Sequence, residues 1–91
     1  LPLDGVYAGW LYAGTERYPA ALSVGINETF QAVPRLIEAH ILDRDDVDLY
    51  DKLVTLAYVD FVRASAKFDG VESLVAEINR DLEKIRQRLG L

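Results

Sequence analysis

The sequence predicts an antiparallel β-sheet or barrel with one long helix at its C-terminal end. Residues 5–64 contain four runs rich in β-branched and aromatic residues, separated by turn-forming segments, which is typical of antiparallel strands. Residues 71–89 instead repeat apolar residues at spacings of three and four, which only a helix places on one side. With 91 residues, 51% of them hydrophobic, the chain suits one small domain.

The first two runs, residues 5–12 and 18–25, predict a β-hairpin. Gly14 lies between them and can adopt the positive φ that a tight turn requires. The next segment, residues 26–34, shows no hydrophobic period and ends at Pro34, which lacks a backbone donor. We therefore expect a loop there.

The third run, "PRLIEAHILD" (34–43), contains a carboxylate that a simple strand pattern does not explain. Glu38 beside His40 can serve as a general base, because a carboxylate on a partly apolar face is a stronger proton acceptor. The spacing alone favours a solvated pair with no chemical role, and both interpretations remain open. Alternation along the strand predicts one face with Ile37, Ala39 and Ile41, and another with Leu36, Glu38, His40 and Leu42.

An acidic segment and the longest strand follow. Residues 43–52 are too acidic to pack, and they lack the glycine and distal glutamate of a calcium-binding EF-hand, so they predict a solvated loop. Residues 53–64 predict a strand long enough to bend around a barrel. Arg63 and Lys67, on either side of the next turn, can hold an anionic ligand or balance Asp60 and Asp69.

The helix predicted over residues 71–89 is the clearest element. Asp69 followed by Glu72 resembles a capping box, and Gly90 is a natural stop. The spacing predicts two surface ion pairs, Glu77 with Arg80 and Asp81 with Lys84. The apolar stripe consists of Val71, Leu74, Val75, Ile78, Leu82, Ile85 and Leu89.

Charge and composition exclude several classes of partner. The net charge of −5 argues against nucleic acid, which requires a basic surface. No basic amphipathic stretch or long apolar run predicts a membrane partner. The sequence has no cysteine and its first residues do not resemble a secretory signal, so we expect a cytoplasmic protein. Because Leu1 is not an initiator methionine, we expect a fragment.

Five segments are informative when they are taken in order: "DGVYAGW" (4–10), "ALSVGINETF" (21–30), "IEAHILD" (37–43), "DLY" (48–50) and "FVRASAKFDGVESL" (61–74). Together they resemble the riboflavin kinase module. The resemblance spans nearly the whole chain, so we expect residues 1–91 to be the C-terminal portion of a riboflavin kinase domain. In bacteria this module usually forms the C-terminal part of a bifunctional riboflavin kinase and FMN adenylyltransferase (FAD synthetase), so the resemblance implies an N-terminal adenylyltransferase domain in the full-length protein.

The resemblance implies a fold and a set of site residues. The fold is a six-stranded antiparallel Greek-key barrel with a long C-terminal helix, here incomplete at its N-terminus. Glu38 falls on the family's general base for the 5'-hydroxyl of riboflavin. The nucleotide-binding positions are Leu49 and Tyr50, and the flavin-binding positions are Leu56, Val59 and Arg63.

The implied reaction is phosphoryl transfer from ATP to riboflavin, giving FMN with the help of Mg²⁺. The family's magnesium ligands belong to a "GFPTAN" segment upstream of residue 4, so we expect no metal ligand in this chain and no activity from the chain alone. Asp51 departs from the glycine that is common in the family. The alternative hypothesis is a β-barrel module that binds flavin or another protein without catalysis.

Overall fold

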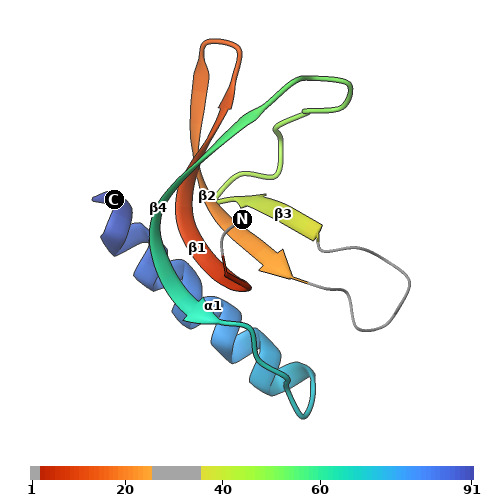
Figure 1. Cartoon of the computed structure of the whole chain (residues 1–91), viewed down its shortest axis with the longest axis vertical. Helices are drawn as coiled ribbons and strands as arrows, with labels where there is room; N and C mark the ends of the chain where they lie inside the picture. The colour runs from red at the N-terminus through yellow and green to blue at the C-terminus, as the bar shows by residue number, and fades with distance from the viewer. Residues whose placement is uncertain (1–2, 26–35) are drawn as a thin grey trace.

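Four strands and one helix make up the residues that the computed structural model describes, 3–25 and 36–91. The strands form one antiparallel sheet in the order β3-β2-β1-β4, which is the Greek-key order 4-1-2-3 (Figure 1). The predicted mainly β fold with a terminal helix is therefore confirmed, and the loop predicted at 26–34 lies outside the described residues. The elements are β1 (Gly5–Ala13), β2 (Glu16–Gly25), β3 (Leu36–Ile41), β4 (Thr55–Ala64) and α1 (Val71–Leu89).

The predicted hairpin is formed by β1 and β2. Ala13 pairs with Glu16, so Gly14 and Thr15 alone make the turn. Gly14 has a φ of 59° and supplies the backbone conformation that two-residue hairpins need. The hairpin prediction is confirmed.

Strand β4 bends over β1, as the long β-branched run predicts. The register between them shifts twice, between Val6 and Tyr7 and between Ala8 and Gly9 of β1. Such bulges leave an extra residue on β4 and increase the local bend of that strand. Near these bulges the chains come so close that a Cβ atom on Gly9 would lie 2.5 Å from the carbonyl oxygen of Ala57.

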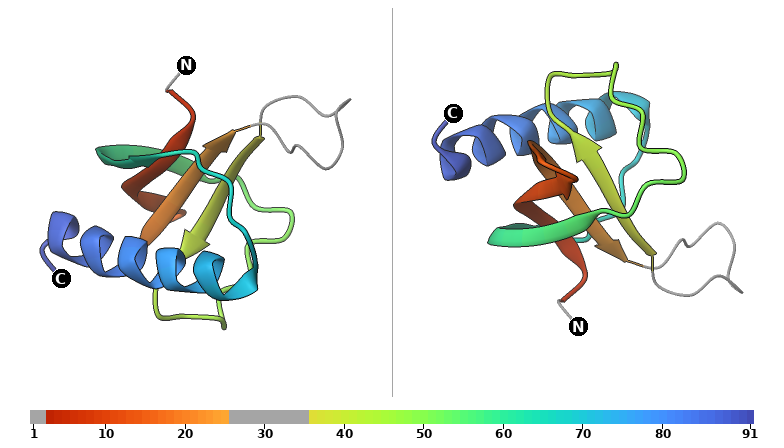
Figure 2. Two further views of the ribbon diagram at one scale, coloured as in Figure 1. Left: turned by 90° about the horizontal axis from the view of Figure 1, so that it is seen from below. Right: turned by 90° about the horizontal axis from the view of Figure 1, so that it is seen from above.

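The sheet buries side chains on both faces. On the inner, concave face the ring of Tyr7 packs edge-on against Tyr58 and Phe61, with centroid distances of 5.1 and 5.2 Å. The inner cluster consists of Tyr7, Leu11, Ala20, Leu22 and Val24. Helix α1 covers the other face of the sheet (Figure 2). The buried cluster on that face consists of Val6, Ala8, Leu42 and Ile85.

Only the C-terminal half of the helical stripe packs closely against the sheet. Ile85 is fully buried, and Leu82 and Leu89 pack around it. Burial of one such aliphatic side chain typically contributes about 1.5–3 kcal/mol. The remaining stripe residues, Val71, Leu74, Val75 and Ile78, are exposed.

The two ends of α1 differ in how well the sequence predicted them. Gly90 ends the helix with a φ of 77° and donates its N–H to the carbonyl of Gln87, as expected. The predicted capping box is wrong, because Gly70 and not Asp69 occupies the N-cap and provides no capping side chain. Ser73 instead donates its hydroxyl to the carbonyl of Gly70 at 3.0 Å.

The segment after β3 is tied to the helix. Leu42 is buried in the helix-side cluster, and the next residue, Asp43, accepts hydrogen bonds from the Arg86 guanidinium, with 3.2 Å between Nε and Oδ2. These hydrogen bonds hold the pKa of Asp43 below its ordinary value of 3.8. Because the folded protein lowers this pKa, the pair stabilises the fold fully above pH 3.8 and loses that contribution as the pH falls through the folded-state pKa.

We expect Asp43→Asn to reduce the acid sensitivity of the fold. Its free energy of unfolding should fall less than that of the wild type between pH 5 and pH 3, because the variant has no carboxylate to protonate there. Urea unfolding at low ionic strength measures this change. Asp45→Asn, an exposed position of the same segment outside this pair, is the control; identical pH profiles for Asp43→Asn and the wild type would contradict the assignment.

Candidate active site

Strand β3 places Glu38 and His40 on the face of the sheet that carries α1. In the β2–β3 register Ser23 lies opposite Glu38, and Ala21 lies opposite His40. The alternate residues of β3 lie opposite inner-face residues of β2, such as Leu22, so the predicted division of the strand into two faces is confirmed. Within the described residues, Glu38 and its neighbours on this face, Leu36 and His40, are exposed, so the partly apolar surroundings expected from the sequence are not found. The carboxylate is instead accessible to a ligand at this edge strand.

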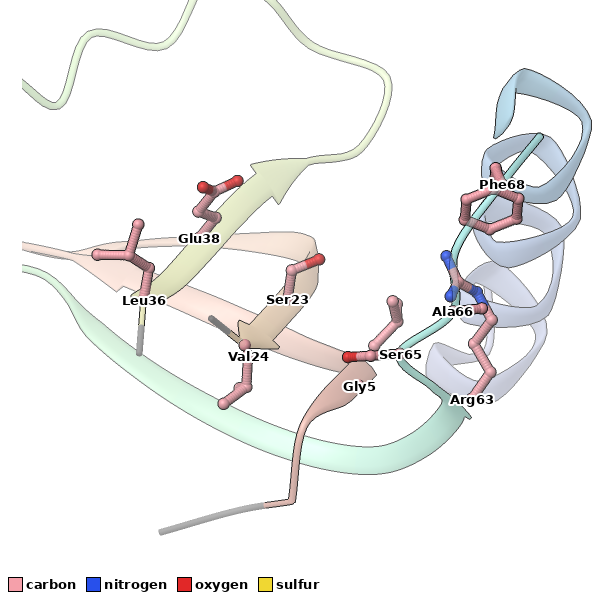
Figure 3. Close-up of a pocket in the computed structure, with 11 residues that line it drawn as sticks. Gly5, Ser23, Val24, Leu36, Glu38, Arg63, Ser65, Ala66 and Phe68 are labelled. Atoms are coloured by element: carbon pink, nitrogen blue, oxygen red, sulfur yellow. The ribbon is translucent and has the colours of Figure 1, made fainter. Parts of the chain in front are cut away.

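A cleft of about 390 Å³ opens beside Glu38. Glu38 borders it from β3, and Arg63 and Phe68 border it from the end of β4 and the segment that leads to α1 (Figure 3). Ser23 lies between these two sides in the same view. The site therefore combines a carboxylate, a hydroxyl, a guanidinium and an aromatic ring from distant parts of the chain.

A second cleft, of about 460 Å³, lies between the sheet and α1. Glu38 and Arg63 line this cleft as well as the first, so these two residues belong to the wall that the clefts share. His40 also lines the second cleft, and Ile78 and Leu82 contribute its apolar side. Glu38 thus lies beside a cavity bordered by the end of β4, as the role of general base requires.

Arg63 is held by carboxylates of α1. Its Nε donates to both carboxylate oxygens of Asp81 at 2.9 Å, and its Nη2 lies 2.8 Å from Oδ2. Glu77 lies further away, 3.4 Å from Nε. The hydrogen bond from Arg80 lowers the pKa of Glu77, as the predicted Glu77–Arg80 pair would do.

The predicted pair of Asp81 with Lys84 is wrong, because Asp81 lies inside and not on the solvent face. Asp81 is three residues after Ile78 and four before Ile85, so it shares the sheet-facing side of the helix with them. This spacing is the feature of the sequence that could have indicated that Asp81 faces the sheet. Arg63 was expected either to hold an anionic ligand or to balance a nearby carboxylate, and the structure shows that it balances a carboxylate. The partner is Asp81 and not Asp60, because Asp60 pairs with Arg88.

Leu49 and Tyr50, the residues predicted to bind the nucleotide, line neither of the two clefts that contain Glu38. Leu49 lines a third cleft of about 610 Å³ between the tip of the β1–β2 hairpin and residues 44–53. Tyr50 is 83% exposed and is not part of that lining; its N–H donates to the Asp48 carboxylate at 3.0 Å. Asp51 has a φ of 59°, so it adopts the left-handed conformation for which the family's glycine is suited.

The three predicted flavin positions on β4 do not share one environment. Leu56 pairs with Leu11 and packs against the inner cluster. Val59 is the extra residue of a bulge and is 49% exposed. Arg63 pairs with Val6 on the helix side, and it alone of the three lines the two clefts that contain Glu38.

The described residues contain neither a metal-binding cluster nor a membrane-spanning helix. Within residues 3–25 and 36–91 no three His, Cys, Asp or Glu side chains come together as a metal site would need. The same part of the chain contains no helix with the length and hydrophobicity needed to cross a membrane.

Comparison with models of protein families identifies the family of this chain. The model of the riboflavin kinase (flavokinase) family matches residues 1–89. The chain belongs to the riboflavin kinase family. The resemblance of the five sequence segments to riboflavin kinase is thereby confirmed.

Individual relatives agree with this assignment. Riboflavin kinase from Mus musculus is 32% identical over 95 residues, which cover all of this chain and 61% of the mouse protein. The bifunctional riboflavin kinase/FMN adenylyltransferase from Listeria monocytogenes is 33% identical over 87 residues, or 94% of this chain and 27% of that protein. This chain thus spans about three-fifths of the mouse riboflavin kinase and a smaller share of the bifunctional relative.

A solved structure has the same fold. The crystal structure described as a macrolide-efflux protein from Streptococcus pneumoniae superposes with a TM-score of 0.81 at 35% identity. The match covers 94% of this chain and 28% of that chain. The sheet and helix described above are thus found within a longer protein.

Proposed function

We propose that the protein is a riboflavin kinase that transfers the γ-phosphoryl group of ATP to the 5'-hydroxyl of riboflavin. The observation that carries this proposal is the position of Glu38, the residue on which the family's general base falls. It is exposed to ligand and shares the wall of two clefts with Arg63. In a chain of the riboflavin kinase family, this position fits a proton acceptor beside a bound alcohol.

The chemistry assigned to Glu38 is proton removal. As the 5'-oxygen of riboflavin forms its bond to the γ-phosphorus, the bond from that phosphorus to the bridging oxygen of ATP breaks. The hydroxyl proton passes to the carboxylate of Glu38, and the products are FMN and ADP. Most of the rate enhancement in such transfers comes from alignment and charge stabilisation, so Glu38 supplies only part of it.

The remaining site residues are assigned by family position. Leu56, Val59 and Arg63 would contact the flavin, and Arg63 has the additional support that it lines the Glu38 clefts. Leu49 and Tyr50 would contact the nucleotide. The third cleft supports this role for Leu49, which lines it together with Lys52, a residue that can neutralise phosphate oxygens; Arg44 in the same lining is already paired with Asp46.

Cofactor, domain and location complete the proposal. The family implies Mg²⁺, but the described residues do not form a site that fits it, so we assign no ligand and no step to the metal. The Listeria relative supports an adenylyltransferase domain in the full-length protein.

We further propose that the protein is cytoplasmic and that its ligands are small molecules. Neither nucleic acid nor a membrane is a partner in this proposal, and the net charge of −5 supports the absence of nucleic acid.

The test is whether the full-length protein forms FMN from riboflavin and ATP. We expect ADP in an amount equal to FMN and FAD together, because the proposed adenylyltransferase domain converts part of the FMN to FAD. The flavins are separated by chromatography and detected by fluorescence and absorbance, and a reaction without ATP is the control for contaminating FMN. If the purified, folded protein binds ATP and riboflavin but forms neither FMN nor FAD, the proposed function is wrong.

A further inference from the structure

Asp81 is the only buried charged residue in the part of the chain that the structure describes. It is 4% exposed and lies on the side of α1 that faces the sheet. A buried carboxylate without compensation would cost several kcal/mol, and the Arg63 guanidinium compensates it with charge-assisted hydrogen bonds. Asp81 also lines the cleft between sheet and helix, so this pair is part of the ligand-binding wall.

The contacts of Arg63 fix its orientation. The edge with Nε and Nη2 points to Asp81, and Nη1 donates to the carbonyl of Ala64 at 3.2 Å. The Phe68 ring lies on another side, with its centroid 5.5 Å from the central carbon of the guanidinium. A guanidinium held on several sides loses little further freedom when it contacts a ligand.

The same contacts cancel its charge. The carboxylate of Asp81 balances the single positive charge of Arg63 at direct contact, and Glu77 adds further negative potential although it is shared with Arg80. An arginine without such compensation attracts phosphate groups strongly. Arg63 therefore offers directed N–H groups and a flat face with little net charge.

We propose that Asp81 is a positioning residue that determines specificity at this wall. It orients Arg63 and neutralises it, so that the clefts beside Glu38 accept the neutral, hydrogen-bond-accepting ring system of riboflavin and hold FMN, with its added phosphate, less tightly than an uncompensated Arg63 would. The inference rests on the proposed function, in which the neutral flavin is the substrate and the phosphorylated flavin must leave. Asp81 thereby favours release of FMN over its retention.

The experiment compares binding of riboflavin and FMN at one site of the full-length protein. Equilibrium dialysis of labelled riboflavin gives its Kd, and displacement of the riboflavin by FMN gives the Kd for FMN, so FMN bound at the proposed adenylyltransferase domain is not counted. The quantity of interest is the ratio of the Kd for FMN to the Kd for riboflavin. We expect Asp81→Asn to lower this ratio about tenfold, the effect of one unit charge on a doubly charged phosphate about 10 Å away at an effective dielectric constant near 20, after screening by salt. A purely structural loosening would weaken both ligands and leave the ratio unchanged.

Asp60→Asn is the matched control. Asp60 also links β4 to α1 through an arginine, Arg88, but it lines none of the three clefts. We expect no change in the ratio for this variant. An unchanged ratio in Asp81→Asn, or the same fall in Asp60→Asn, would overturn the inference.

Arg63→Gln tests the inference in the opposite direction and decides it if Asp81→Asn does not fold. Removal of the cation leaves the Asp81 charge uncompensated, so the ratio should rise; an unchanged or lower ratio would overturn the inference. Wild-type protein that binds both flavins but forms no FMN would refute the proposed function alone, because the ratio can still be measured. Wild-type protein that binds neither flavin would refute both.

Discussion

Replacing Glu38 by Gln is expected to lower kcat for FMN formation by about two to four orders of magnitude, the usual cost of removing a general base. Glutamine has nearly the same shape but cannot take the proton of the 5'-hydroxyl. Because Glu38 lies exposed on an edge strand, the substitution leaves no buried group without a partner. Steady-state assays in the full-length protein should show the loss in kcat, with the KM for riboflavin changed by less than about threefold.

Glu72→Gln provides the control for this experiment. It makes the same chemical change at an exposed position of the first turn of α1, outside the three clefts. Its kcat should match that of the wild type, and both variants should unfold at nearly the wild-type temperature. If Glu38→Gln retained full activity, Glu38 would have no role as the base, and the solvated Glu38–His40 pair considered from the spacing would be the better interpretation.

The features that the sequence predicted well depend on local geometry. Alternation along a strand has a fixed period, so the side of β3 on which Glu38 lies could be deduced before its neighbours were known. The same holds for Gly14 and Gly90, whose positive φ values follow from the turn and the helix end that they form. The position of the candidate base was therefore predictable, although its accessibility at a cleft was not.

The features that the sequence missed depend on what lies next to each element in space. Asp81 has the spacing of a surface ion pair with Lys84, and only the packing of α1 on β4 shows that its partner is Arg63. The helical period likewise marks Val71 and Ile85 as equivalent, whereas the sheet covers Ile85 and leaves Val71 exposed. A pattern of period 3.6 shows which side is apolar but not how much of that side another element reaches.

Gly9→Ala is expected to destabilise the fold by about 3 kcal/mol, near the upper end of what overpacking usually costs. The new methyl group would lie 2.5 Å from the carbonyl oxygen of Ala57 and 2.6 Å from Cδ1 of Leu22, which is fully buried. Neither neighbour can yield easily, because one is backbone and the other is packed in the inner cluster. The matched control is Gly25→Ala, where the methyl group would meet, within residues 3–25 and 36–91, only Ser65 Oγ at 3.7 Å; its free energy of unfolding should stay within about 0.5 kcal/mol of the wild type.

Urea unfolding followed by the fluorescence of Trp10 measures this difference directly. Trp10 is the only tryptophan of the sequence and pairs with Ala57 on β4, so its emission reports on the contact that the substitution disturbs. Because β4 carries Arg63 to the clefts beside Glu38, weaker docking of this strand should also weaken flavin binding. A Gly9→Ala variant as stable as the wild type would mean that β1 and β4 do not approach so closely, and the bend that brings Arg63 toward α1 would need another cause.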